Sequence, residues 1–217
     1  MSQGAYVYRA FPPGVVSNTL DFDVRWVVHH SRRMRGVFAR RRIGITECSL
    51  YVGLYPGYRK SKEEIANKFT SYAARHLVDE RTAIRKTCVY NLSLERVDPG
   101  YRLDPTDDEG TILSEFSSCI VCYINESPPK SSPQAAFVYN WPRQRYEVWL
   151  LNAVEQDEEI FLYYGKYYLR DYPFNTTCDN RIFHIIPMDS VLAPDRRGVP
   201  SPLQVPDQDF KYDAVQE

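Results

Sequence analysis

Short strand-like runs are the feature that most constrains what this chain can fold into. Eight segments of four to eight residues are rich in Val, Ile and Tyr, a composition typical of β-strands. Turn sequences such as "DPGY" and "NESPPKSSP" lie between several of them. The pattern predicts a mainly β protein built from several small sheets. The segments are "VRWVVHH", "GVFA", "CSLYVGLY", "CVYNLSL", "CIVCYI", "AAFVYNW", "YEVWLLNA" and "EIFLYYG".

One helix is predicted, over residues 61–77. It opens on Ser61, and Glu64 follows three residues later, which together form a capping-box pattern. Apolar side chains then recur near the helical period, so one face of the helix is expected to pack on the core. The residues of this apolar stripe are Ile65, Phe69, Tyr72 and, at its end, Leu77.

Composition limits the class of protein. With 217 residues, 43% of them hydrophobic, the chain can form one domain with a sizeable core. A formal net charge of -1 argues against a general nucleic-acid binder, so no direct nucleic-acid partner is expected. No apolar run approaches the roughly 18 residues of a membrane span, and the start lacks a signal-peptide pattern. An intracellular protein, nuclear or cytoplasmic, is expected.

The five cysteines do not form a recognisable metal site. Cys119 and Cys122 make a single CxxC pair, and no second pair follows at ligand spacing. In a strand, these two thiols would also point to opposite faces. Buried reduced cysteines and no bound metal are therefore expected. Glycine-rich phosphate loops and the G-x-S-x-G elbow are absent as well, and the four histidines are isolated or adjacent in a strand.

Two local clusters each allow two interpretations. Residues 32–42, "RRMRGVFARRR", contain six arginines, which could form a solvated turn beside a strand or a site for an anionic group such as a carboxylate. Residues 163–168 contain four tyrosines. These could fill a core, or they could line a channel that is apolar and still offers hydroxyl groups.

Five motifs in a fixed order make the chain similar to a known family. Between residues 22 and 170 the order resembles that of the SET-domain family of protein lysine methyltransferases. The motifs are "RRMRGVFA", "SLYVGLY", "YNLSLERVDPGYRLDPTDDEG", "CYINES" and "YEVWLLNAVEQDEEIFLYYG". Each motif is weakly specific alone, and their common order carries the resemblance.

The resemblance implies a fold and a division of the chain. The fold would be a SET-type arrangement of several small β-sheets with one inserted helix. The "CYINES" and Tyr164 segments would meet in a pseudoknot-like crossing. Residues 1–21 would be an N-terminal extension, and residues 22–170 the catalytic domain, with an insert at about 55–118. Residues 171–217 would form a C-terminal extension that covers the site, with a proline-rich tail disordered from about residue 191.

The same resemblance implies an enzyme that transfers a methyl group from S-adenosyl-L-methionine to a lysine amine of a protein. Tyr164 stands in the place of the family's catalytic tyrosine. The residues implied to bind the cofactor are Arg33, Arg35, Gly36, Tyr90, Asn125 and Glu126. The residues implied to line the substrate channel are Leu162, Tyr167 and Tyr168.

The chain departs from the family pattern at several positions. Met34 replaces the first glycine of the G-x-G motif, Glu126 a histidine, Pro128 a cysteine and Tyr163 an aspartate. A second function therefore stays open, in which a catalytically weak domain of this type serves as a protein-binding or chromatin adaptor. The substrate could be a histone tail or another protein. The acidic stretches "DPTDDEG" and "EQDEE" would suit a basic peptide, or they could be solvated loops.

Overall fold

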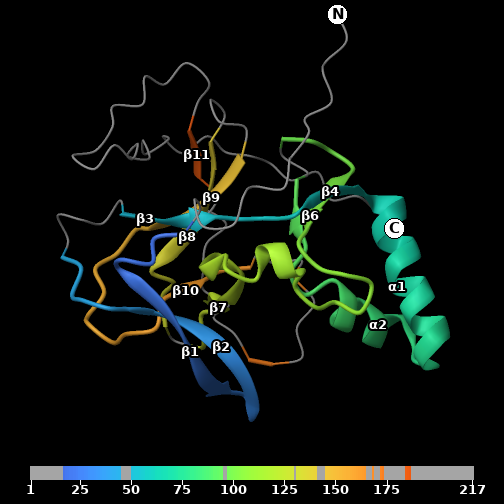
Figure 1. Cartoon of the computed structure of the whole chain (residues 1–217), viewed down its shortest axis with the longest axis horizontal. Helices are drawn as coiled ribbons and strands as arrows, with labels where there is room; N and C mark the ends of the chain where they lie inside the picture. The colour runs from blue at the N-terminus through green and yellow to red at the C-terminus, as the bar shows by residue number, and fades with distance from the viewer. Residues whose placement is uncertain are drawn as a thin grey trace, which may run out of the picture.

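The chain folds mainly into β-structure, as predicted (Figure 1). The computed structural model describes residues 17–44, 50–94, 97–129, 131–140, 145–164, 168, 172–173 and 184–186. Within these ranges there are four small sheets and two α-helices. The expected tail from about residue 191 and the channel residue Tyr167 lie outside the described residues.

The largest sheet has four strands in the order β11-β8-β9-β3. Strands β8 (Ala135–Asn140) and β9 (Arg145–Leu150) pair antiparallel, and nearly all of their side chains are buried. Strand β3 (Leu50–Leu54) extends the sheet antiparallel to β9, while β11 (His184–Ile186) pairs parallel to β8. This sheet contributes to the one large hydrophobic core cluster, which also includes Phe22 and Leu103.

A two-stranded hairpin projects from this core. Strands β1 (Phe22–His29) and β2 (Arg32–Ala39) pair antiparallel along their full length, with His30 and Ser31 in the left-handed region at the turn. Burial along β2 changes from exposed arginines near the turn to buried residues at its end. The first arginines of the 32–42 run thus lie within the strand, so the interpretation as a turn flanking the strand is wrong for them.

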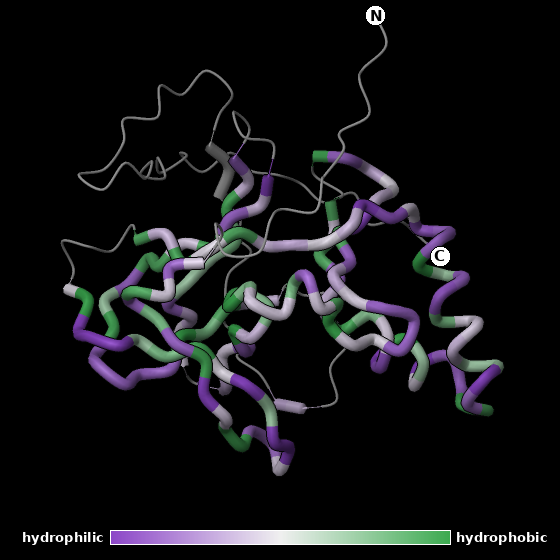
Figure 2. Tube along the Cα trace, in the orientation of Figure 1, coloured by the Kyte–Doolittle hydropathy of each residue, from purple (hydrophilic) through white to green (hydrophobic). Residues whose placement is uncertain are grey.

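The region expected as an insert forms a sheet and both helices. Strands β4 (Tyr58–Ser61), β5 (Leu92–Ser93) and β6 (Tyr101–Asp104) form a sheet in the order β4-β6-β5. Helix α1 (Lys62–His76) follows β4, and α2 (Glu80–Thr87) precedes β5. In Figure 1 these elements occupy one side of the molecule, and Figure 2 shows hydrophilic stretches along α1 at that edge.

The prediction for α1 is confirmed at its start and wrong at its end. The Ser61 hydroxyl accepts from Glu64 N at 3.1 Å, and the Glu64 carboxylate accepts from Ser61 N at 2.7 Å. Ile65 is buried, but Leu77 is 93% exposed. Leu77 is the C-cap, at φ 53°, and its left-handed backbone turns the side chain out of the helical stripe.

A single inserted helix was expected, and the second helix, α2, corrects that expectation. Asp79 caps it by accepting from Thr82 N at 2.9 Å. The helix has only eight residues and buries only Ala83 and Thr87, and a helix this short is marginal without tertiary contacts. Tertiary packing against α1 holds a segment that its pattern alone does not predict.

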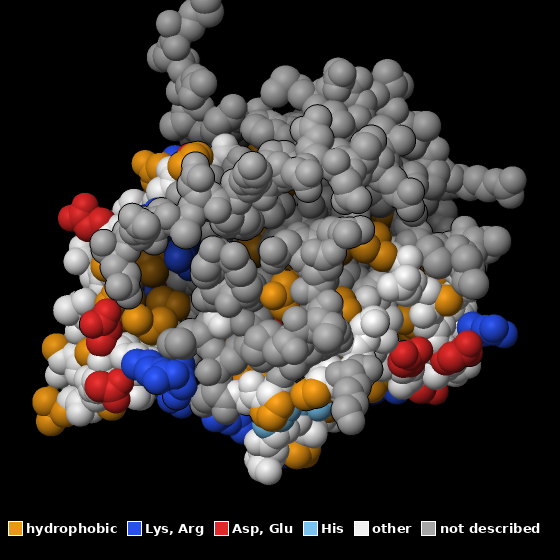
Figure 3. All heavy atoms as spheres, turned by 180° about the vertical axis from the view of Figure 1, so that it is seen from behind, with side chains coloured by type: hydrophobic (Ala, Val, Ile, Leu, Met, Phe, Trp, Pro, Cys, Tyr) orange, Lys and Arg blue, Asp and Glu red, His pale blue; other side chains and the backbone are white. Residues whose placement is uncertain are grey.

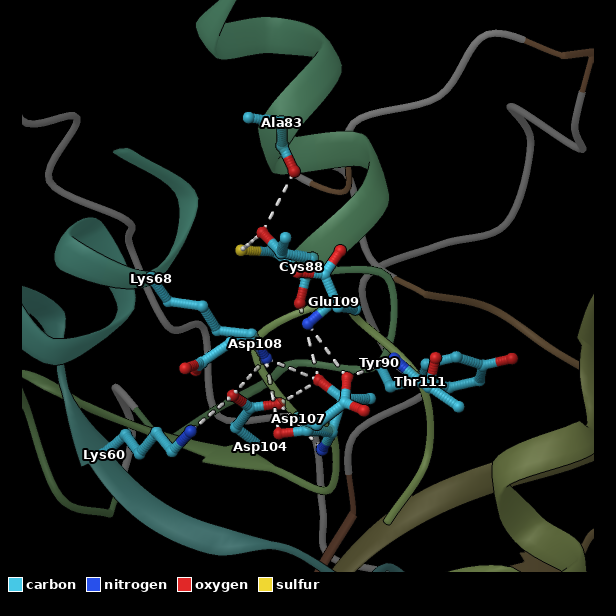
Figure 4. Close-up of polar contacts among 12 residues, drawn as sticks. Lys60, Lys68, Ala83, Cys88, Tyr90, Asp104, Asp107, Asp108, Glu109 and Thr111 are labelled. Carbon is cyan, nitrogen blue, oxygen red and sulfur yellow. Dashed lines mark hydrogen bonds and ion pairs between the residues drawn. The ribbon is translucent and has the colours of Figure 1, made fainter. Parts of the chain in front are cut away.

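A buried ion cluster fastens α1 to strand β6 (Figure 4). The Lys68 ammonium lies 2.7 Å from an Asp104 carboxylate oxygen, and Lys60 lies 3.1 Å from the same oxygen. The Thr106 hydroxyl lies 2.6 Å from Lys68 Nζ and 2.6 Å from the other Asp104 oxygen. It is also 3.5 Å from the carbonyl of Thr87 at the end of α2. One carboxylate therefore links both helices to the small sheet.

The segment "CIVCYI" is not the strand that its composition indicates. Residues Ile120–Tyr123 form a 3₁₀ helix, η3, shortly after another short one, η2 (Ser114–Phe116). Alternation therefore does not apply to the cysteine pair. Cys119 and Cys122 are nevertheless both buried and reduced, as expected. Burial raises the pKa of the Cys122 thiol well above its usual value, so the group stays protonated.

Strands β7 (Asn125–Glu126) and β10 (Phe161–Leu162) bring two distant motifs together. They pair in parallel, with Asn125 opposite Phe161 and Glu126 opposite Leu162. Ser127 N extends the contact by donating to Leu162 O at 2.9 Å. The "CYINES" segment and the Tyr164 segment therefore lie side by side. In the described part of the chain, no helix is long and apolar enough to cross a membrane.

Candidate functional site

The hairpin, the end of α2, η3 and β7 surround a cavity of about 420 Å³. Its size lies in the range of small-molecule and cofactor sites. Residues from five separate stretches of the sequence reach it. The predicted site residues that line this cavity are Arg33, Arg35, Tyr90, Asn125, Glu126, Tyr164 and Tyr168.

A second cavity, of about 40 Å³, adjoins the first. Five residues line both cavities and stand between them, namely Tyr90, Tyr164 and Tyr168 together with Val89 and Cys122. The predicted channel residue Leu162 lines the smaller cavity, as do the rings of Tyr55 and Phe137. The smaller space is thus mainly aromatic and apolar, whereas the larger one is rich in charged groups.

Tyr164 is fixed by two polar contacts. Its hydroxyl donates to Ile124 O at 2.7 Å, and its main-chain N donates to Glu126 Oε1 at 3.1 Å. Although the residue borders both cavities, burial raises the pKa of its phenol well above the usual value. The group is therefore a neutral phenol at physiological pH, unable to act as a tyrosinate base. Its oxygen keeps lone pairs that can accept a hydrogen bond.

The neighbouring tyrosines have distinct positions. The ring of Tyr168 contacts the ring of Tyr164 edge to face, with centroids 4.8 Å apart, and its hydroxyl donates to Val89 O at 3.3 Å. Tyr163 is only 5% exposed and lines neither cavity. The four-tyrosine cluster thus contains both of the alternatives that the sequence allowed: Tyr163 packs in the core, while Tyr164 and Tyr168 line cavities.

Glu126 holds two segments of the site through hydrogen bonds from both of its carboxylate oxygens. Besides accepting from Tyr164 N, it accepts from the Tyr172 hydroxyl at 3.1 Å through its other oxygen. Tyr172 in turn stacks on His30 at the hairpin turn, with centroids 4.9 Å apart. The Glu126 side chain therefore ties the Tyr164 segment to a residue that reaches the hairpin.

Glu159 is a site residue that the sequence did not reveal. Asn125 Nδ2 donates to Glu159 Oε1 at 2.7 Å and to Arg35 O at 2.9 Å. The other Glu159 oxygen lies 2.8 Å from His29 Nε2. Thirty-four positions separate Asn125 and Glu159, and no spacing rule connects them. The acidic turn before β10 was the only available signal, and it allowed either a surface for a basic peptide or a solvated loop.

Gly36 is required for a different reason from the one that the resemblance implied. It does not line the larger cavity. A Cβ atom at this position would lie 2.3 Å from Glu159 Oε1 and 3.3 Å from Asn125 Nδ2. The glycine therefore makes room for the Glu159 carboxylate, which in turn orients the Asn125 amide, and direct approach to a cofactor is not needed to explain it.

The larger cavity is lined by several basic side chains. Arg32, Arg33 and Arg35 reach it from the hairpin, and Arg85 reaches it from α2. The guanidinium groups of Arg33 and Arg35 lie 4.6 and 5.5 Å from the ring centre of Trp26, and Arg35 also lies 4.9 Å from that of Tyr123. In Figure 3 basic and histidine side chains gather at the lower edge, near the hairpin turn. A ligand with an anionic end fits this lining.

Zinc is not expected in the purified protein. Among the residues that the structure describes, no group of three or more His, Cys, Asp or Glu side chains could hold a metal ion. Elemental analysis of protein purified without chelators should give far less than one zinc per chain. A stoichiometric zinc content, removable only with loss of folding, would contradict this prediction.

Comparison with models of known protein families finds no match to this chain. Comparison with curated proteins likewise finds no significant relative.

Proposed function

We propose that this protein is an S-adenosylmethionine-dependent protein lysine N-methyltransferase of the SET type. The observation that carries the proposal is the position of Tyr164, which borders both a large charged cavity and a small aromatic one. A methyl transfer between two separately bound substrates needs such an arrangement, because the donor and the acceptor must meet at one point from two sites. The ordered sequence motifs support the same reaction.

The larger cavity has the chemistry to hold the cofactor. Arg33 and Arg35, whose guanidinium groups lie over the rings of Trp26 and Tyr123, suit its carboxylate. Asn125, held by Glu159, offers an amide to its amino-acid end. When bound, the cofactor supplies a methyl group made electrophilic by the positive sulfur.

The smaller cavity would receive the lysine side chain. A free lysine has a pKa of about 10.4, so near neutral pH only about one in a thousand is the neutral nucleophile, a deficit of roughly 4 kcal/mol. A space lined by Tyr55, Phe137 and Leu162 disfavours the charged ammonium relative to water. The Tyr164 oxygen, whose proton is donated to Ile124 O, can accept an N–H of the amine and orient it.

Replacing Asn125 with alanine should weaken cofactor binding by about 1–3 kcal/mol, because a buried hydrogen-bonding group is lost. The amide also contacts Arg35 O and Glu159, so the variant releases the Glu159 carboxylate as well. Calorimetric titration of both proteins with S-adenosylhomocysteine measures the change. Asn152→Ala, at an amide that donates to Pro133 O away from both cavities, is the control. Equal affinities for Asn125→Ala and the unchanged protein would show that Asn125 does not contribute to cofactor binding.

The function itself is tested by transfer of a radiolabelled methyl group from S-adenosylmethionine to core histones and to a cell lysate. Label should appear on a protein lysine and should depend on the added protein. Labelling of a histone would identify the substrate class, and labelling of other lysate proteins alone would point to a non-histone substrate. If no protein is labelled, the proposed methyltransferase activity is contradicted.

An adaptor that binds a protein without methylating it is the second candidate. It is favoured by the aromatic lining of the smaller cavity, since rings around a small space attract methylated ammonium groups. The acidic stretches offer less support for a basic partner. Glu109 pairs with Arg75 and His76, and Asp157 with Arg25, so part of that charge is neutralised within the chain. Binding of S-adenosylhomocysteine distinguishes the enzyme from the adaptor.

A further inference from the structure

Asn91 contributes an unusual group to the smaller cavity. It lies between the end of α2 and strand β5, and its main-chain N donates to Cys88 O at 3.1 Å. Asn91 is one of the residues that line the smaller cavity. Both polar atoms of its amide, Oδ1 and Nδ2, are buried and have no hydrogen-bond partner among the residues that the structure describes. Buried polar groups in folded proteins are nearly always hydrogen-bonded, so this amide calls for an explanation.

Other amides of the chain are satisfied by protein groups. Asn18 Nδ2 donates to Asp21 and to Tyr51 O, and its Oδ1 accepts from Asp21 N. The fully buried Asn140 donates to Glu147 at 3.2 Å. Asn91 differs because neither polar atom of its amide has a partner in the described part of the chain, while the residue itself lines a cavity. An occupant of that cavity can supply the missing bonds.

The size of the cavity and the chemistry of the amide restrict the occupant. The volume of about 40 Å³ has room for one small head group, since one water molecule occupies about 30 Å³ in the liquid. The amide offers one acceptor oxygen and one donor NH₂ group. An ammonium carries donors only and would leave Nδ2 unpaired. A neutral primary amine carries both N–H donors and a lone pair, so it matches both halves of the amide.

We propose that Asn91 is the positioning residue that receives the substrate lysine amine in its neutral form. This inference rests on the proposed methyltransferase function. Asn91 Oδ1 accepts one N–H of the amine, and Nδ2 donates to the lone pair once the ammonium has released its proton to solvent. Because hydrogen bonds to the neutral form disfavour the charged form, Asn91 lowers the pKa of the bound amine. The lone pair then turns from Nδ2 toward the larger cavity.

Asn91→Leu removes both polar atoms while nearly keeping the side-chain volume. The fold should be as stable as before or more stable, because unsatisfied buried atoms are replaced by apolar ones. Affinity for S-adenosylhomocysteine should not change, whereas methyl transfer should fall about 10- to 100-fold. Asn18→Leu is the matched control. It loses three hydrogen bonds outside the cavities, so its melting temperature should fall while its transfer rate per folded molecule is kept.

Asn91→Asp tests the effect on the amine pKa. A carboxylate pairs with the ammonium and raises its pKa, so the neutral fraction at a given pH falls. The rising limb of the pH–rate profile should therefore move to higher pH in this variant. An Asn91→Leu protein with an unchanged rate, or an Asn91→Asp protein with an unchanged profile, would overturn the role of Asn91 and leave the methyltransferase standing. A wild-type protein that binds no cofactor and transfers no methyl group would overturn both.

Discussion

Replacing Tyr164 with phenylalanine is expected to lower the methyl-transfer rate about 10²–10³-fold, or roughly 2.7–4 kcal/mol in transition-state stabilisation. Tyr164 lines both cavities, and its hydroxyl oxygen is proposed to orient the amine. Cofactor affinity should stay largely intact, since the phenol is assigned to the amine. The variant also leaves Ile124 O without its donor, so about 1–3 kcal/mol of folding stability could be lost as well. Rates are therefore compared per folded molecule.

Tyr163→Phe is the matched control for this prediction. It removes the same atom from the adjacent residue, which is buried and lines neither cavity. Its transfer rate should stay near that of the unchanged protein, with at most a small change in stability. Equal rate losses in the two variants would show that the assigned register is wrong. An unchanged rate in Tyr164→Phe would refute the catalytic role of that residue.

Replacing Asp104 with alanine is expected to destabilise the fold by about 3–5 kcal/mol, because it leaves a buried ammonium without its counter-ion. Asp104 is fully buried, and the side chain of its partner Lys68 is only 2% exposed. The Thr106 hydroxyl and main-chain N lose their acceptor in the same variant. Urea unfolding followed by circular dichroism measures the loss of stability.

Glu109→Gln is the control for the ion cluster. Glu109 forms ion pairs with Arg75 and His76 in which all three side chains are 44–50% exposed, so its loss should cost little stability. A loss as small as this in Asp104→Ala would mean that the cluster contributes little to stability. Because Thr106 also contacts the end of α2, partial unfolding in Asp104→Ala should disturb Tyr90 and Asn91, which follow that helix.

Strongly patterned segments could be predicted from the sequence, and segments held by tertiary contacts could not. Strands β1, β8 and β9 carry dense β-branched and aromatic residues, and α1 carries its own capping box. Helix α2 has a capping aspartate but only eight residues, and the 3₁₀ turn at Ile120–Tyr123 has no side-chain cap. An apolar run as short as "CIVCYI" suits either a strand or a tightly buried turn, and only packing decides between them.

The same distinction between sequence pattern and tertiary contact applies to the residues of the site. Motif order indicated Arg33, Arg35, Tyr90, Asn125 and Tyr164, and the structure brings these residues to one cavity. Motif order could not indicate Glu159, whose carboxylate orients the Asn125 amide. It could not indicate Asn91 either, whose buried amide has no partner among the described residues. Both properties depend on which distant side chains meet in space. The reason for Gly36 was likewise hidden, since it concerns the room left for Glu159.

The most direct test of the proposed function is a calorimetric titration of the purified, folded protein with S-adenosylhomocysteine. We expect saturable binding of one cofactor per chain. The affinity should be weakened in Asn125→Ala and largely kept in Tyr164→Phe and Asn91→Leu. A folded protein that releases or absorbs no heat at millimolar cofactor would contradict the assignment of the larger cavity, and with it the methyltransferase.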